Sequence, residues 1–176
     1  MGAPELSLPA TRRRPRLSLV GALDHYEFKG VWRVDARPVD VFEVLADLDA
    51  YPAWWPEVKA VERLGETAVA VRVRSFLPYE LRFEMHQVVR DAQSGVLEVS
   101  MAGDLEGFSR WTVTGEEGGS RLLFEEEVRT NRAVLNRLAP VARPAFKVNH
   151  AFMMRHGEAG LRTYMAGFGR ALRSSA

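Results

Sequence analysis

Two spacings of apolar residues occur along the chain, alternation and a helical repeat. Over 25–35 and over most of 58–130, apolar side chains recur at every second position, which is typical of strands with one buried face. The clearest case is 79–90, where one face carries Tyr79, Leu81, Phe83, Met85 and Gln87. Residues 144–169 instead repeat at helical spacing. The pattern therefore predicts a run of antiparallel strands followed by one long helix.

Two short helices are predicted between the first strand and the remaining strands. Pro38 suits a first helical turn, and the apolar residues after it are spaced for a short helix. Pro52 and Pro56 limit a second helix to about one turn. Trp54 and Trp55 lie between these prolines, and we expect one to pack in the core and the other to lie at a rim.

The long helix is predicted to run from Pro144 to Gly169. Its apolar face carries Phe146, Met153, Met154, Gly157, Leu161, Tyr164, Met165 and Phe168. His150 and Gly157 stand near the centre of this face, where a close-packed seam rarely places an imidazole or a missing side chain. We therefore expect the face to form a cavity wall. The alternatives are a core histidine with its hydrogen bonds satisfied and a close strand approach at Gly157.

The strands are apolar on one face and charged on the other, so their apolar face needs a cover, and the long helix is the element that can supply it. The predicted fold class is α+β: a curved antiparallel sheet of about six or seven strands wrapped around the C-terminal helix, with two short helices after the first strand. We expect one domain over 23–170, a flexible basic tail over 1–22 and a disordered C-terminus over 171–176.

Several stretches of the chain resemble the SRPBCC or START-like superfamily, whose fold is called helix-grip. The resemblance covers 25–169 and is carried by Pro38 to Phe42, Tyr51 to Val58, Gly107 to Trp111, Gly119 to Arg121 and Asn149 to Gly157. It implies the fold described above. It implies less about activity, because members of the superfamily range from lipid carriers to polyketide cyclases and dehydrases.

Composition excludes several classes of function. The net charge of +1 gives no reason to expect a nucleic-acid partner. The chain has no Cys, which excludes disulfides and thiol chemistry and suits the cytoplasm. No apolar run approaches the roughly 18 residues that span a bilayer, so we expect no integral membrane association. Nucleotide, dinucleotide and serine-hydrolase motifs are absent from the sequence, and we expect neither a cofactor nor a metal site.

One inward polar pair stands out as candidate chemistry. Glu126 lies on the apolar face of the last strand, where a carboxylate is costly unless it is paired. A contact with His150 would satisfy both groups and give the cavity a polar end, whereas His156 points to another side of the helix. The expected ligand-binding residues are Tyr79, Leu81, Phe83, Met85, Val99, Trp111, Phe124, Glu126, His150, Met153, Met154, Gly157 and Leu161. We expect a cavity within the usual range for ligand pockets, ~300–1,000 Å³.

Three functions are consistent with this pattern. The first is binding or transport of an apolar small molecule, such as a lipid, an isoprenoid or a polyketide-like compound, by a monomer or homodimer. The second is a polyketide aromatase/cyclase in which His150 and Glu126 are the catalytic candidates; alternation places Arg74 outward, which weakens this hypothesis. The third is a structural domain with a filled core.

Overall fold

Seven antiparallel strands form one sheet in the order β1-β7-β6-β5-β4-β3-β2. The computed structural model describes residues 25–77, 79–131 and 143–174 of the chain. The strands are β1 (His25–Val34), β2 (Val58–Arg63), β3 (Ala68–Val73), β4 (Leu81–Asp91), β5 (Val96–Gly103), β6 (Leu105–Glu116) and β7 (Gly119–Thr130). The helices are α1 (Pro38–Ala46), the 3-10 turn η2 (Leu48–Ala50), α2 (Tyr51–Trp54) and α4 (Arg143–Ser174). The predicted tail over 1–22 lies outside the described residues.

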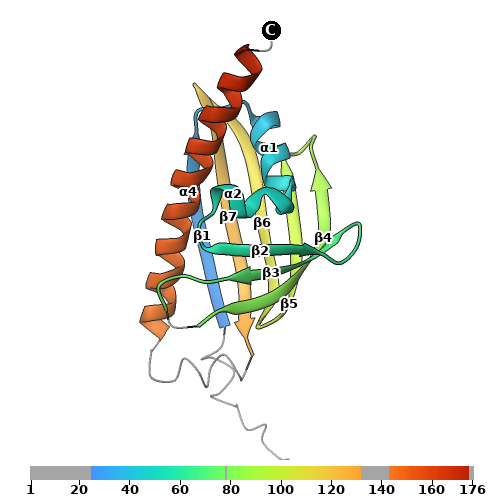
Figure 1. Ribbon diagram of the computed structural model, residues 1–176, viewed down its shortest axis with the longest axis vertical. Coiled ribbons are helices and arrows are strands. Elements are labelled where there is room, and N and C mark those ends of the chain that lie inside the picture. Colours follow the sequence, from blue (N-terminus) through green and yellow to red (C-terminus); the bar gives the residue numbers. More distant parts are fainter. Residues whose placement is uncertain (1–24, 78, 132–142, 175–176) are drawn as a thin grey trace, which may run out of the picture.

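The sheet curls so that β2 and β3 cross in front of β1 and β7, and α4 runs along the side of the sheet next to β1 (Figure 1). This is the helix-grip arrangement predicted from the sequence. Alternation along the strands decides which side is inside: Val69, Val71 and Val73 of β3 are buried, whereas Arg72 and Arg74 are exposed. The inward face of the sheet is therefore apolar and is covered by α4, α1 and α2.

Side chains of α4 pair with the backbone of the edge strand β1. The Arg33 N–H donates to Glu158 Oε1 at 3.3 Å, and the Arg162 guanidinium donates to the Arg33 carbonyl at 2.7 Å. An edge strand otherwise presents unpaired backbone groups, so these bonds fix α4 against the sheet. The helix continues to Ser174, so the predicted end at Gly169 was wrong, and residues 171–174 of the segment predicted to be disordered are helical.

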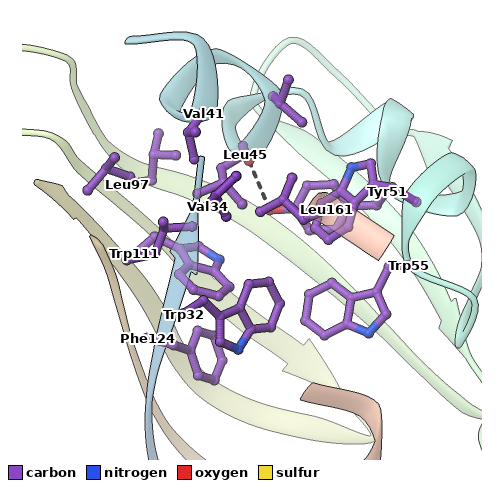
Figure 2. Close-up of a cluster of buried hydrophobic side chains, with 14 of the residues drawn as sticks. Trp32, Val34, Val41, Leu45, Tyr51, Trp55, Leu97, Trp111, Phe124 and Leu161 are labelled. Carbon is purple, nitrogen blue, oxygen red and sulfur yellow. Dashed lines mark hydrogen bonds between the residues drawn. The ribbon is translucent and has the colours of Figure 1, made fainter. Parts of the chain in front are cut away.

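The larger apolar cluster of the core lies where α1 and α2 meet the sheet, and it is built around aromatic side chains (Figure 2). Trp54 and Trp55 are both buried, with ring centroids 5.4 Å apart. The expectation that one of them lies at a rim was therefore wrong. Both fit because Trp55 packs against Trp32 of β1, and Trp54 packs against Tyr51. Tyr51 in turn donates its hydroxyl hydrogen to the Leu45 carbonyl, shown as the dashed line in Figure 2.

Candidate functional site

Trp55 joins α2 to the long helix, and its side chain belongs both to the larger apolar cluster and to the lining of a cavity. Its indole N–H donates to the Met153 carbonyl of α4 at 3.0 Å. A Cβ at Gly157 would lie 2.7 Å from Trp55 Cε2 and 2.8 Å from Trp32 Cη2, so only glycine allows this approach. Gly157 is therefore a packing residue. The prediction that it faces the cavity was wrong, because two tryptophan rings occupy the space that a side chain would take.

A cavity of about 150 Å³ lies between the sheet, the first half of the described α4 and the short helices, from which Leu45, Tyr51 and Trp55 reach its lining. It is smaller than the few hundred Å³ expected from the sequence. Most of its lining is apolar and comes from several strands. The predicted residues that line it are Leu81, Phe83, Met85, Val99, Trp111, Phe124, Glu126, His150, Met153 and Met154. An apolar cavity of about 150 Å³ is known to accept benzene, so this one has room for about one aromatic ring.

Three predicted lining residues lie elsewhere. Gly157 packs against the rings of Trp32 and Trp55. Leu161, one helical turn beyond Gly157, is fully buried in the larger apolar cluster. Tyr79 precedes β4 and packs in a second apolar cluster with Leu81, Phe146 and Tyr26. Burial raises the pKa of Tyr79 to about 12. The helical and alternating patterns were extended past the ends of the cavity, and this explains all three errors.

His150 and Glu126 form the polar end of the cavity. The His150 Nε2 and Glu126 Oε2 atoms are 2.9 Å apart, and the two side chains are only 18% and 10% exposed. With Glu126 ionised, Nε2 is the donor, because a carboxylate only accepts hydrogen bonds. The predicted pairing is thus present. The register of the sheet sets Glu126 of β7 beside Phe28 of β1 and Ser109 of β6, and α4 brings His150 to it.

The imidazole of His150 is held in place by an aromatic neighbour. The ring of Phe28 stacks on it with a centroid distance of 3.7 Å and an interplanar angle of 14°. Phe124 lies 6.1 Å away on a roughly parallel plane. These contacts, together with the bond to Glu126, fix the orientation of the ring relative to the cavity. The arrangement can present a hydrogen-bonding group to a bound molecule or transfer a proton to it.

Asn149 is a polar lining residue that the sequence analysis did not select. Its side chain is 5% exposed, and its Nδ2 faces the Met153 sulfur at 3.4 Å. Its Oδ1 is buried without a hydrogen-bond partner among the described residues. Gln87, Glu98 and Ser109 also line the cavity. The sequence feature that could have indicated Asn149 is its position next to His150. Consecutive residues of a helix point about 100° apart, however, so a neighbour of an inward residue is not expected to point inward as well.

The remaining candidate groups do not belong to this cavity. His156 lies on another side of α4, as predicted. There its Nδ1 atom is 2.7 Å from Glu57 Oε1. Arg74 is exposed, and its backbone N–H bonds to the Glu57 carbonyl. Within the described residues, no cluster of three or more His, Asp or Glu side chains is arranged to hold a metal ion. None of the described helices is both long enough and apolar enough to cross a membrane.

Similar folds occur among solved structures of low sequence identity. The Zhui aromatase/cyclase from Streptomyces sp. R1128 is 15% identical, with a TM-score of 0.66 over 80% of this chain and 93% of that one. A START superfamily protein from Mycobacterium smegmatis is 16% identical, with a TM-score of 0.65 over 81% and 98%. A conserved protein from Geobacillus kaustophilus is 9% identical, with a TM-score of 0.69 over 81% and 96%. At these identities the likeness concerns the fold.

Comparison of the sequence with protein families and with curated proteins gives two results. No curated protein matches the chain. Residues 26–165 match the family described as polyketide cyclase / dehydrase and lipid transport. The match contains all the strands, apart from His25 at the start of β1, and it also contains most of α4. The chain therefore belongs to that family, within the SRPBCC or START-like superfamily that its sequence resembles.

Proposed function

We propose that the protein binds an apolar small molecule in the cavity between the sheet and α4. The observation that carries the proposal is a largely apolar cavity of about 150 Å³ with one polar end, formed by His150 and Glu126. Ligand sites combine an apolar wall, which supplies binding energy, with a few fixed polar groups, which orient the ligand. The volume favours a ligand of about one ring, or one end of a longer lipid, isoprenoid or polyketide-like molecule.

Direct titration tests this proposal. We expect toluene or a fluorescent fatty acid to bind saturably with one site per chain, as measured by calorimetry and fluorescence. A matched variant is Met153→Trp, in which a larger side chain fills part of the cavity, and Ala159→Trp on the exposed face of α4 is its control. Binding should fall in the first variant and persist in the second. If neither probe binds saturably, the domain has no ligand site and the structural alternative stands.

A second candidate is catalysis of cyclisation or dehydration of a polyketide-like substrate in the same cavity. The favouring observation is the hydrogen bond between His150 Nε2 and Glu126 Oε2, because an imidazole oriented by a carboxylate is a common acid–base device. The exposed position of Arg74 removes one candidate basic residue from the site. His150→Ala separates the two functions. It should abolish turnover of a poly-β-ketone substrate if the protein is a cyclase, and weaken probe binding only modestly if it is a carrier.

A further inference from the structure

The outward face of α4 carries exposed apolar side chains that the cavity does not use. Val148 is 61% exposed and Phe152 is 36% exposed, one turn apart on the helix. Phe76, in the connection between β3 and β4, is 56% exposed, and its ring packs edge-on against Phe152 with centroids 5.2 Å apart. The structure thus brings three large apolar side chains from two distant segments to one place on the surface. We call Phe76, Val148 and Phe152 the α4 patch.

The helix that carries Val148 and Phe152 has an excess of positive charge. The sequence of α4 contains six Lys and Arg residues and a single acidic residue, Glu158, although the whole chain has 24 basic and 23 acidic residues. Glu158 is already bonded to Arg162 and to the backbone of β1. Lys147 and Arg155 are exposed beside the patch, and neither has an acidic partner within the described part of the chain. The surface is therefore both apolar and cationic.

A carboxylate close to the patch, that of Glu57, does not offset this charge at the surface. Glu57 is 5% exposed and is paired with His156, whose ring packs 4.0 Å from Phe152. The segments 1–24 and 132–142, which the structure does not describe, are themselves rich in arginine. They, and a second copy of the same face, would bring like charge to the patch. Complementarity thus requires an anionic partner with an apolar layer, and a lipid surface of negative charge has both properties.

We propose that the α4 patch docks the protein on an anionic membrane surface. Phe76, Val148 and Phe152 enter the headgroup region, while Lys147 and Arg155 contact lipid phosphates. The docking segment is also part of the cavity wall, since Phe146, His150 and Met153 line the cavity from the opposite side of the same helical turns. Docking places the cavity against the bilayer. The inference concerns the outer surface and is independent of whether the cavity binds a ligand.

Vesicle flotation with the full chain tests the proposal. We expect binding to vesicles of phosphatidylcholine with about one-third phosphatidylglycerol, no binding to phosphatidylcholine alone, and a loss of binding as the salt concentration rises. The double variant Lys147→Glu/Arg155→Glu should lower the partition coefficient by roughly tenfold or more, because each basic residue near an anionic surface contributes about fivefold. Phe76→Ser/Phe152→Ser should lower it as well.

Matched controls place one apolar and one cationic change elsewhere on the surface. Val88→Ser and Arg129→Glu alter exposed residues of β4 and β7 and should leave vesicle binding unchanged. Circular dichroism checks that each variant is folded. Absence of binding to anionic vesicles overturns the proposal. Binding that persists in both α4 double variants also overturns it, since the arginines of the N-terminal segment would then be responsible. A dimer that the Phe76→Ser/Phe152→Ser variant dissociates would assign the patch to a second copy instead.

Discussion

Gly157 lies directly against the indole ring of Trp55, and this contact sets how closely the long helix approaches α2. The added Cβ of any other residue would meet Trp55 and Trp32 at under 3.0 Å. Gly160, one turn further, allows a similar approach to the Trp54 carbonyl. The indole N–H of Trp55 then reaches the Met153 carbonyl. Two glycines in one helix, each unfavourable there by about 1 kcal/mol relative to Ala, are thus offset by packing against tryptophan.

Gly157→Ala should therefore lower the stability of the protein. The clash involves the rigid ring atoms of Trp55 and Trp32, so the helix must shift outward, and overpacking of this kind costs roughly 1–3 kcal/mol. Thermal or denaturant unfolding measures the change. Gly167→Ala is the matched control, because a Cβ there meets nothing within 4 Å. That control should gain up to about 1 kcal/mol from helix propensity. Equal behaviour of the two variants would show that Gly157 faces open space.

The pairing of His150 with Glu126 was predictable from the sequence, whereas the role of Gly157 was not. Each of the paired residues stands on an apolar face, where an unpaired polar group is costly, so the pattern itself required a partner. A glycine on an apolar face has no such requirement. The sequence pattern around such a glycine is the same whether the glycine borders a cavity or packs against a ring from a distant segment. That ring belongs to Trp55, and one of the two adjacent tryptophans was expected to lie at a rim.

The extent of the cavity also could not be predicted from the local pattern of apolar residues. Alternation correctly selected the inward faces of β4, β5, β6 and β7, and helical spacing correctly selected Met153 and Met154. Neither periodicity tells where along an inward face the packing changes from dense to open. In the structure Trp55 packs against the middle of α4, and Leu161 beyond it belongs to the apolar cluster and does not line the cavity. The order of strands and the long covering helix followed directly from periodicity and length.

A double-mutant cycle on His150 and Glu126 should give a coupling free energy of about 1–3 kcal/mol. The reason is burial: with side chains 18% and 10% exposed, removal of either partner leaves the other poorly solvated. The variants are His150→Ala, Glu126→Ala and their combination, compared by denaturant unfolding. The pair His86 and Glu84 on β4 has a similar separation, 3.1 Å, but exposures of 45% and 51%. Its coupling should be below about 0.5 kcal/mol. Equal coupling in both pairs would contradict the account of a buried polar end.

Asn149→Leu should raise the stability of the ligand-free protein. The change removes a buried oxygen that has no partner among the described residues and keeps a side chain of similar size, so the gain should be about 1 kcal/mol. The control is Thr163→Leu on the exposed face of α4, which tests helix propensity and should change stability by less than about 0.5 kcal/mol. Thermal unfolding distinguishes the two. A loss of stability in Asn149→Leu would mean that the amide is fully hydrogen-bonded in the folded protein.

Tyr79→Phe should make the protein less sensitive to alkaline pH. Burial raises the pKa of Tyr79 to about 12 in the folded protein, whereas an unfolded tyrosine has a pKa of about 10. Below pH 10 both states keep the proton, so this residue gives stability no pH dependence. Between pH 10 and 12 the unfolded state releases the proton and the folded state retains it, which favours unfolding.

A fully buried group would lose about 1.4 kcal/mol of stability per pH unit in this range, and the partial exposure of Tyr79 reduces the loss to about 1 kcal/mol at pH 11. Phenylalanine cannot ionise and so avoids the loss. Near pH 8 the variant should be more stable by up to about 1 kcal/mol, because the change removes a buried hydroxyl that has no hydrogen-bond partner in the described part of the chain. Urea unfolding of both proteins at pH 8 and pH 11 measures the difference, and a difference that does not change between these pH values would show that the Tyr79 hydroxyl is solvated in the folded state.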